Sequence, residues 1–294
     1  MKVKGGNETA TFCFELTGAP QTWSRRLILR LYPEYRAPED AAWESSVQNA
    51  LANAGYPVAS TYAVCTDRSI LGGAFFIMEC LPGETLWKAP VEAIPVLLGK
   101  SHAALHRIDP GFLLGLLREQ GFDENRYIFG KLYDRLPGLA EEHPWMREIV
   151  AWLIENRPPE PEHLVICHND FHPGNILVRD GEVTGVLDWH LSIADPALDI
   201  ANTIKLITVH CKNSPGSEVV DWDLFLRSYL AAYQAQVSLG IPNVDYFRVL
   251  RSLADLYDGF MGNQHLRQPC FRKDLVAFIH EATGIWVQLP EIMI

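Results

Sequence analysis

The stretch HNDFHPGNILVRDGEVTGVLDW, residues 168–189, decides how this chain is interpreted. Within it, Asp180-Gly181 separates two apolar runs, and this pattern is a strong signal for a two-residue turn between antiparallel strands. The strand pairs that follow from such a turn are Arg179 with Glu182, Leu177 with Thr184 and Asn175 with Val186. This register places Asp188 beside Pro173, at the same end of the hairpin as Asn175.

The side chains at that end of the hairpin suit magnesium and phosphoryl transfer. Mg²⁺ prefers hard oxygen ligands, takes one or two of them from protein, and leaves the others to water and phosphate. We therefore predict that Asn175 and Asp188 hold Mg²⁺, which neutralises charge on a transferring phosphoryl group. Asp170, on the loop before the hairpin, is the predicted catalytic residue, because its carboxylate can orient a substrate hydroxyl and accept the proton of that hydroxyl.

Three motifs in this part of the chain resemble one family. The spacing His168-x-Asp170-x₄-Asn175 is similar to the catalytic loop of protein kinases. The whole segment 168–175 resembles the H-G-D-x-H-P-G-N signature of aminoglycoside phosphotransferases and choline-kinase-like enzymes. Asp188-Trp189 looks like that family's substitute for the kinase D-F-G, and residues 195–201 are similar to its D-P-x-x-D-[LI]-A segment. The motifs occur in the order and at the spacing that this family shows.

The resemblance implies both a fold and an activity. The fold would be α+β and bilobal, of the protein-kinase-like type, with a small antiparallel β lobe that carries one helix and a larger, mostly α-helical lobe. The activity would be that of a small-molecule kinase, which moves the γ-phosphate of ATP or GTP onto a hydroxyl group with the help of Mg²⁺. Relatives of this fold use aminoglycosides, macrolides, choline-like alcohols, homoserine and sugars as acceptors, and the sequence leaves the acceptor open.

The resemblance extends to the first part of the chain, where it implies a nucleotide site. Arg30 stands where kinases place the lysine that holds the α- and β-phosphates, and Glu44 stands at its helical partner position. An Arg–Glu pair can form a bidentate, charge-assisted contact, so this replacement is compatible with function. The phosphate-covering turn would contain Gly5, Gly6 and Asn7. The lobe connector would hydrogen-bond the base through the backbone of Glu79 and Leu81.

The first eighty residues are predicted to be rich in strands. Strands are expected at 11–16 and 26–31, and a helix at 39–54 that Gly55 ends. Gly72-Gly73 then links two further strands, the second of them at 74–79. These elements make up the predicted nucleotide-binding lobe, residues 1–80.

From residue 81 onward most segments have helical periodicity. Residues 81–84 are the predicted connector, and residues 85–294 the predicted catalytic and substrate-binding lobe. The exception is a compact block of strands from about 164 to 187. Helices are expected at 94–105, 221–237, 244–261 and 272–286.

Charge and composition limit the partners and the compartment. The formal net charge of −11 argues against nucleic acid, and it permits a cationic substrate without requiring one. No apolar stretch approaches the roughly 20 residues that span a bilayer, so we expect a cytoplasmic protein without a membrane contact. The six widely spaced cysteines are expected to be reduced thiols. Five acidic residues are expected on solvated helix faces: Asp221, Asp223, Asp255, Asp258 and Glu281.

Three residues around the predicted site are expected to support it structurally. His168 would brace the catalytic loop, and Asp199 would hold that loop by hydrogen bonds. Asp195, followed by Pro196, is a good helix N-cap with proline at the first helical position. We therefore assign no chemistry to these residues.

Two other functions are compatible with parts of the sequence. A nucleotide-binding protein without catalysis would explain Arg30 and the abbreviated glycine-rich turn. A metal-dependent hydrolase would use a cluster of histidine and aspartate ligands, namely His168, Asp170, His172, Asp188 and His190. The hydrolase leaves Asn175 and the segment 195–201 unexplained, whereas the phosphotransferase explains both.

Overall fold

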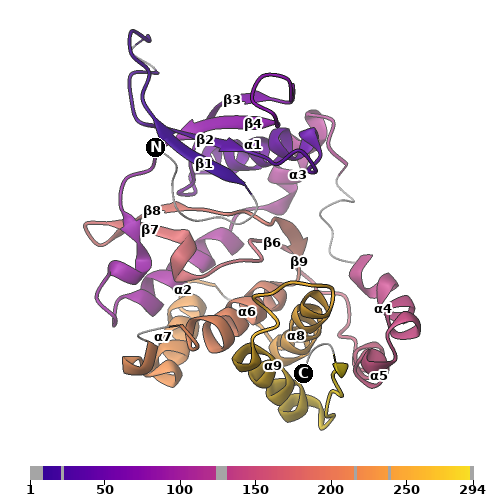
Figure 1. The fold of residues 1–294 in the computed structure, drawn as a ribbon. Coiled ribbons are helices and arrows are strands. Elements are labelled where there is room, and N and C mark those ends of the chain that lie inside the picture. Colours follow the sequence, from indigo (N-terminus) through magenta and orange to yellow (C-terminus); the bar gives the residue numbers. More distant parts are fainter. Residues whose placement is uncertain (1–8, 21–22, 124–130, 215–216, 238–239, 292–294) are drawn as a thin grey trace. The chain divides into compact units, whose positions relative to one another are not determined.

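A computed structural model describes residues 9–20, 23–123, 131–214, 217–237 and 240–291, without the side chains at positions 131, 132 and 134. The chain forms two compact units, and each is made from separate segments (Figure 1). Unit 1 comprises Met1–Ala89, Gly111–Glu124 and Pro173–Trp189. Unit 2 comprises Pro90–Pro110, Asn125–His172 and His190–Ile294. The functional division at residues 81–84 stays a prediction.

Unit 1 is built on a four-stranded antiparallel sheet in the order β1-β2-β4-β3. The strands are β1 (Ala10–Phe14), β2 (Leu27–Leu31), β3 (Thr61–Cys65) and β4 (Phe75–Glu79). Helix α1 (Pro38–Asn53) packs against β3 and β4 (Figure 1). The strands predicted at 11–16, 26–31 and 74–79 and the predicted helix are therefore confirmed to within two residues at each end, and β3 is the further strand expected before Gly72.

Local chemistry explains where α1 begins and ends. Pro38 occupies the first helical position and acidic side chains follow it in the first turn, where the partial positive charge of the helix favours them. Gly55 then adopts a φ of +80°, a left-handed conformation that glycine takes without strain and that stops the helix. Between α1 and the sheet lies a small apolar core that includes Tyr32, Ala41 and Phe76.

A second sheet of unit 1 contains the predicted hairpin. Its order is β5-β7-β8, with β5 (Glu84–Thr85), β7 (Ile176–Arg179) and β8 (Glu182–Val186). Asp180 and Gly181 both have positive φ values, +55° and +82°, as the predicted two-residue turn requires. Arg179 pairs with Glu182 as expected.

The rest of the predicted hairpin register is wrong by one residue. Leu177 pairs with Gly185 instead of Thr184, and Val186 pairs with Ile176 instead of Asn175. The cause is a bulge in which Thr184 is the extra residue of β8. Its hydroxyl donates a hydrogen bond to the carbonyl of Pro82 at 2.5 Å, outside the strand ladder. A turn signal fixes the start of a hairpin, but it carries no information on such a bulge.

Unit 2 is mostly helical. Its helices are α2 (Ile94–His106), α4 (Lys131–Glu142), α5 (Arg147–Glu155), α6 (Pro196–Lys205), α7 (Trp222–Gln234), α8 (Val244–Phe260) and α9 (Pro269–Thr283). Helix α3 (Pro110–Glu119) lies almost wholly in unit 1. The helices predicted in this half of the chain are confirmed, with ends that differ by up to three residues.

Two short strands complete unit 2. Strand β6 (Val165–Cys167) lies in the predicted strand block and pairs antiparallel with β9 (Ser192–Ala194). The sequence reasoning missed β9, because three residues carry no readable alternation of apolar and polar positions. The expected N-cap of α6 is confirmed, since the Asp195 carboxylate accepts the backbone N–H of Ala197 at 2.8 Å. The predicted α+β class is thus confirmed.

Helices α2 and α7 approach each other closely at Gly99. A Cβ atom added at Gly99 would lie 2.4 Å from the carbonyl oxygen of Tyr229 and 2.9 Å from the backbone nitrogen of Tyr233. No side chain fits in that space, so glycine permits this approach of the two helices. The contact matters for the site, because both tyrosines hydrogen-bond to histidines of α2.

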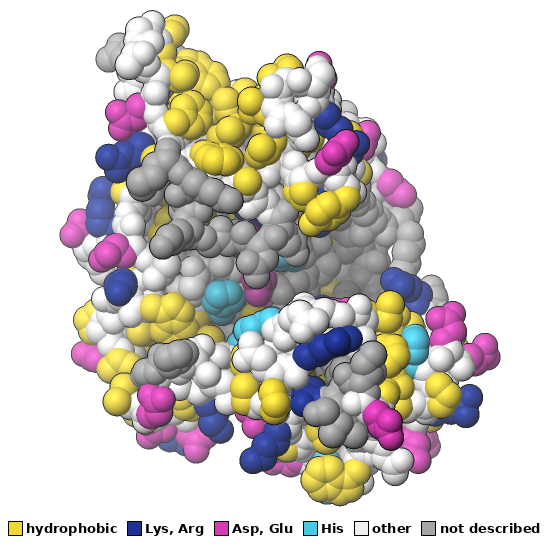
Figure 2. All heavy atoms as spheres, in the orientation of Figure 1, with side chains coloured by type: hydrophobic (Ala, Val, Ile, Leu, Met, Phe, Trp, Pro, Cys, Tyr) yellow, Lys and Arg dark blue, Asp and Glu magenta, His cyan; other side chains and the backbone are white. Residues whose placement is uncertain are grey.

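The surface is mixed in character. Acidic and basic side chains are interspersed on the face shown in Figure 2. Exposed apolar side chains of unit 1 include Tyr62, Val64, Ile70 and Leu71.

Among the described residues, no helix has both the length and the apolar character needed to cross a bilayer. None of the six cysteines, all of which lie in the described residues, forms a disulfide, and only Cys167 is buried.

We predict opposite effects for alanine at two helical glycines. Gly99→Ala should destabilise the protein by about 1–3 kcal/mol, because the new methyl group collides with the backbone of α7. Gly115→Ala, in α3, meets no atom within 4 Å and should stabilise by about 0.5–1 kcal/mol through helix propensity. Urea unfolding of both variants measures the difference. Equal effects would contradict the close approach of α2 and α7.

Candidate active site

Unit 1 places Arg30 between two carboxylates. Arg30 lies on β2, opposite Phe76 of β4, and its side chain is only 13% exposed. Its Nη1 atom is 3.3 Å from Oε1 of Glu44 and 2.8 Å from Oδ1 of Asp188. The hydroxyl of Tyr32 donates a hydrogen bond to the other oxygen of Glu44. The structure therefore brings together three residues that the sequence assigned to the nucleotide and metal site.

Charge pairing in this cluster outweighs burial. Burial by itself lowers the pKa of the Arg30 guanidinium, but the negative charges of Glu44 and Asp188 raise it, and the net direction is upward. Burial raises the pKa of the Tyr32 hydroxyl, and the charge of Glu44 raises it further. Arg30 is therefore a permanent cation at this position, and Tyr32 is a permanent hydrogen-bond donor to Glu44.

Asn175 and Asp188 lie at the same end of the β7–β8 hairpin, as predicted. The N–H of Leu187 donates to the carbonyl of Asn175 at 2.8 Å, which ties the two strand ends together. Asp188 has a positive φ of +59°, an unusual conformation for a non-glycine residue that is found at functional sites. The indole of Trp189 is buried, and its Nε1 donates to the carbonyl of Val186 at 3.1 Å.

The donor set in this region fits Mg²⁺. Asn175 offers an amide oxygen and Asp188 a carboxylate, and these hard oxygen donors are the type that magnesium prefers. Arg30 contacts Oδ1 of Asp188. The carboxylate of Asp188 is about one-third exposed. A hydrated cation can therefore reach it.

The predicted connector is fixed to the hairpin. A Cβ atom on Gly185 of β8 would lie 2.3 Å from Cδ1 of Leu81, so Leu81 occupies the space that this glycine leaves open. The N–H of Glu79 donates to the carbonyl of Ser60. The connector and the candidate metal ligands thus belong to one compact unit. The predicted phosphate-covering residues Gly5, Gly6 and Asn7 lie outside the described residues.

Unit 2 contains Asp170, the predicted catalytic residue. Its carboxylate is 32% exposed, and its Oδ2 lies 3.7 Å from Nε2 of His172, which is longer than a direct hydrogen bond. Burial raises the pKa of Asp170, but interaction with His172 and the nearby His168 and His190 lowers it, to about 2. At neutral pH Asp170 is therefore an anion that accepts hydrogen bonds.

Helix α6 holds the loop that carries Asp170. The buried carboxylate of Asp199 accepts the backbone N–H of His168 at 2.6 Å and that of Asn169 at 2.8 Å. The hydroxyl of Thr203 donates to the carbonyl of Phe171 at 2.9 Å. The side chain of Asn202 donates to the carbonyl of Asn169. The expected supporting role of Asp199 is thus confirmed.

His168 has the bracing role expected of it. Its ring is fully buried, and Nδ1 accepts the backbone N–H of Asp170 at 3.2 Å. Asn169 adopts a left-handed φ of +65°, and its side-chain amide donates to the carbonyl of His190 at 2.7 Å. The loop is therefore held at successive residues by the buried side chains around it.

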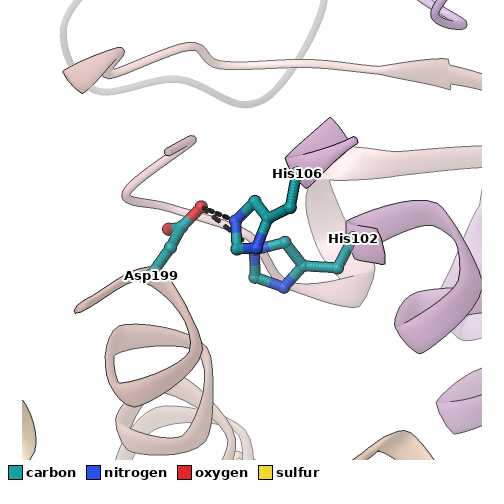
Figure 3. Close-up of side chains that lie close together, drawn as sticks. All are labelled: His102, His106 and Asp199. Carbon is teal, nitrogen blue, oxygen red and sulfur yellow. Dashed lines mark hydrogen bonds and ion pairs between the residues drawn. The ribbon is translucent and has the colours of Figure 1, made fainter. Parts of the chain in front are cut away.

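Two buried histidines that the sequence reasoning missed lie against Asp199. Figure 3 shows that His102 and His106, one turn apart on α2, both face this carboxylate. Their Nε2 atoms lie 3.0 Å and 3.4 Å from the same oxygen, Oδ2. The signal available in the sequence was the spacing of four residues between His102, in the helix predicted at 94–105, and His106, directly after it. Burial and the neighbouring His106 lower the pKa of His102, whereas the charge of Asp199 raises it. The resulting pKa is about 4.

Asp255 is not on a solvated helix face, contrary to expectation. Its side chain is only 13% exposed and forms an ion pair with the buried amine of Lys205 at 2.6 Å. His210, from the π-helical segment Leu206–Cys211 that follows α6, lies 3.5 Å from the same carboxylate. Periodicity placed Asp255 on a polar face, but it could not reveal that a lysine of α6 covers that face.

Within unit 2, the described residues do not gather the ligand set of the alternative hydrolase. Among the described residues, His102, His106 and Asp199 form the group of three whose potential ligand atoms lie within 4.8 Å of one another. The members of the hydrolase set in unit 2 do not form such a group among the described residues. The fully buried His168 is already used as an acceptor within its own loop.

Comparison with known proteins identifies relatives of the chain. A family model described as "Phosphotransferase enzyme family" matches residues 2–243. Acyl-CoA dehydrogenase family member 10 of Mus musculus is 30% identical over 256 residues, which cover 76% of this chain and 21% of that protein. Aminoglycoside 3'-phosphotransferase of Streptomyces fradiae is 28% identical over 208 residues, covering 66% of this chain and 75% of that protein. The chain thus spans about a fifth of the length of the first of these relatives.

Solved structures show the same fold. A protein from Ralstonia eutropha assigned as an aminoglycoside phosphotransferase superposes with a TM-score of 0.67 at 21% identity, covering 96% of this chain and 89% of that one. A thermostable mutant of aminoglycoside phosphotransferase APH(4)-Ia, in a ternary complex with AMP-PNP and hygromycin B, gives 0.65 at 15% identity, with coverages of 97% and 94%. The protein-kinase-like fold predicted from the sequence is confirmed.

We predict that the protein loses stability as the pH falls from about 6.5 to 4. His102 has a folded pKa of about 4, below the 6.5 of an unfolded histidine, so the unfolded chain binds the extra proton in this window. The titration of His102 alone should lower the free energy of unfolding by about 3 kcal/mol over the whole window. Carboxylates with lowered pKa values, such as Asp199, destabilise only as the pH falls below about 5, at the lower end of this window and beneath it.

Urea unfolding at pH 7, 6 and 5 measures this loss. His102→Gln should flatten the dependence by up to about 1.4 kcal/mol per pH unit. His163→Gln, which replaces an exposed histidine, should keep the dependence of the unmodified protein. An unchanged slope in His102→Gln would show that His102 does not titrate in this window.

Proposed function

The chain belongs to the phosphotransferase enzyme family, and on this premise we propose that it transfers the γ-phosphate of ATP or GTP to a hydroxyl group of a small molecule, with Mg²⁺ as cofactor. The residues proposed to carry the reaction are Asp170, Asn175 and Asp188, with Arg30 and Glu44 at the nucleotide. A cytoplasmic location, where nucleotide is plentiful, goes with this activity.

The observation that supports this proposal most directly is the double ion pair of Arg30. A buried cation is retained between Glu44 and Asp188, in the same compact unit as Asn175 and the connector. In the proposed complex Arg30 contacts the nucleotide phosphates, and Glu44, held by Tyr32, keeps the guanidinium in place. Asn175 and Asp188 hold Mg²⁺, which shields the negative charge of the phosphates.

Asp170 is the proposed catalytic residue on the side of the acceptor. It is an anion at neutral pH, with a pKa of about 2, so it accepts a hydrogen bond from the acceptor hydroxyl and orients it. A carboxylate this acidic is a weak base. It takes the proton only as the new P–O bond forms and the hydroxyl becomes acidic.

The nucleotide base is proposed to bind at the backbone of Glu79 and Leu81. Leu81 packs on Gly185 of the hairpin that carries Asp188, so base binding and metal binding would take place within one compact unit. The acceptor is proposed to be a small molecule, as the names of the relatives from Streptomyces fradiae and of the hygromycin B complex indicate for those proteins. The class of alcohol stays open.

A nucleotide-binding protein without transfer is the second candidate. It is favoured by one observation, the contact of Arg30 with Asp188, which occupies one oxygen of the candidate metal ligand. In that case Mg²⁺-nucleotide would bind without release or transfer of phosphate across a broad set of alcohols.

We predict that ATP or GTP raises the melting temperature only when Mg²⁺ is present. Ligands that bind the folded state stabilise it, by about 2.7 kcal/mol at a hundredfold excess over Kd. The measurement is thermal unfolding with each nucleotide, with and without Mg²⁺. No shift with either nucleotide, together with stoichiometric zinc in the purified protein, would contradict the phosphotransferase and favour the hydrolase.

We further predict that three Asp→Asn variants separate chemistry from binding. Asp170→Asn should lower turnover at least about a hundredfold and leave Mg²⁺-nucleotide affinity unchanged. Asp188→Asn should weaken Mg²⁺-nucleotide binding itself. Asp180→Asn, in the exposed hairpin turn, is the matched control and should change neither quantity, because asparagine tolerates the same left-handed conformation. Isothermal titration and phosphate-transfer assays measure both quantities. Full turnover in Asp170→Asn would refute its catalytic role.

A further inference from the structure

The buried histidines of α2 each have a tyrosine partner on α7. Nδ1 of His102 lies 2.8 Å from the hydroxyl of Tyr229, and Nδ1 of His106 lies 2.8 Å from the hydroxyl of Tyr233. The histidines are one helical turn apart, and so are the tyrosines. All four side chains are less than 5% exposed. Two matching chains of contacts therefore lead from α7 through α2 to one oxygen of Asp199. Figure 3 shows the part of these chains between the histidines and Asp199.

The chemistry of the partners fixes where the protons lie. A carboxylate only accepts hydrogen bonds, so Nε2 of both histidines must carry the proton that is donated to Asp199. His102 is neutral, and its Nδ1 is therefore a lone pair that accepts the hydroxyl proton of Tyr229. The direction of donation runs from Tyr229 to His102 and on to Asp199.

These chains end on the loop that carries Asp170. The two histidines meet Asp199 on Oδ2, the oxygen that also accepts the backbone N–H of His168, while Oδ1 accepts that of Asn169. With four donors around it, the carboxylate has one favourable orientation. If a donor from α2 were lost, the carboxylate could rotate, and the loop would lose its anchor two residues before Asp170.

We propose that the pairs His102–Tyr229 and His106–Tyr233 are positioning residues, which orient Asp199 and through it hold Asp170 in place for phosphoryl transfer. This inference rests on the proposed function for its effect on catalysis. Its structural part, the orientation of Asp199 by the two pairs, can be tested without any activity.

The same three groups could instead hold a metal ion, but the contacts favour hydrogen bonds. A structural zinc site takes four protein ligands, and the described residues offer three around this point. Oδ2 of Asp199 already accepts three hydrogen bonds, and Oδ1 accepts a fourth. The tyrosine hydroxyls complete the hydrogen bonding of both rings without a metal.

The first experiment determines the protonation of the rings directly. Protein labelled with ¹⁵N-histidine is studied at pH 7 by long-range ¹H–¹⁵N correlation, and metal content is measured in parallel. We expect His102 as the neutral Nε2–H tautomer and a proton on Nε2 of His106. The Nδ1–H tautomer of His102, or a metal-bound Nε2 with one equivalent of zinc, would overturn the proposal.

The second experiment uses tyrosine variants. Tyr229→Phe and Tyr233→Phe each remove one hydroxyl, and Tyr233→Phe is the cleaner change because the Tyr229 hydroxyl also interacts with Thr203. Tyr246→Phe is the matched control, since it removes another buried hydroxyl of unit 2, which donates to the carbonyl of Leu153 at 3.0 Å. We expect the first two variants, but not the control, to shift the backbone amide resonances of His168 and Asn169.

Kinetics then separate positioning from general stability. For the two α7 variants kcat should fall about tenfold or more with an unchanged Kd for Mg²⁺-ATP, because Asp170 is displaced while the nucleotide site in unit 1 is untouched. Tyr246→Phe should leave kcat unchanged, even if it lowers the melting temperature as much as the two α7 variants do. Equal losses of kcat in all three variants, or unshifted amides in the α7 variants, would overturn the proposal. If no acceptor supports turnover, the proposed function fails, while the ring and amide measurements still decide the positioning role.

Discussion

The candidate catalytic loop depends on the hydrogen bonds that the carboxylate of Asp199 accepts. This carboxylate is fully buried, and an isolated buried anion would be strongly unfavourable. Four N–H donors compensate it, two from the backbone of the loop and two from the imidazoles of α2. Burial alone would raise the pKa of Asp199, but interaction with His102 and His106 reverses the direction and lowers it well below its usual range. The loop is thus held by an anion that stays ionised because the loop and α2 surround it.

The approach of α2 and α7 makes this arrangement feasible. Gly99 lies one turn before His102, at the point where the backbones of the two helices almost touch. A larger residue would move α7 outward and carry the hydroxyls of Tyr229 and Tyr233 away from the imidazole nitrogens, which lie at 2.8 Å. The hydrogen bonding around the carboxylate of Asp199 therefore depends on the close packing of α2 and α7, although these two helices are far apart in the chain.

Much of the fold and of the site could be predicted from the sequence, because local signals specified it. The Asp180-Gly181 turn, the Asp195 N-cap and the end of α1 at Gly55 are each set by the residues that form them. The bulge at Thr184 could not be predicted, since it depends on a hydrogen bond to Pro82, about a hundred residues earlier in the chain. The histidine pair and the burial of Asp255 were missed for the same reason, because their partners lie on other helices. The metal, nucleotide and catalytic roles rest on motif resemblance and stay predictions.

Unit 1 stabilises a buried cation, whereas unit 2 stabilises the anion Asp170, and this difference bears on how a phosphotransferase could work. In unit 1 the cation Arg30 is held by two carboxylates, so a phosphate that bound there would compete with Asp188 for a guanidinium that is already oriented. If Mg²⁺ binds Asp188, it neutralises that competitor and leaves Arg30 available to the phosphates. In unit 2 the anion Asp170 is kept ionised by the surrounding imidazoles. Metal binding and phosphate binding would then be coupled in unit 1, whereas Asp170 in unit 2 is ionised without either ligand.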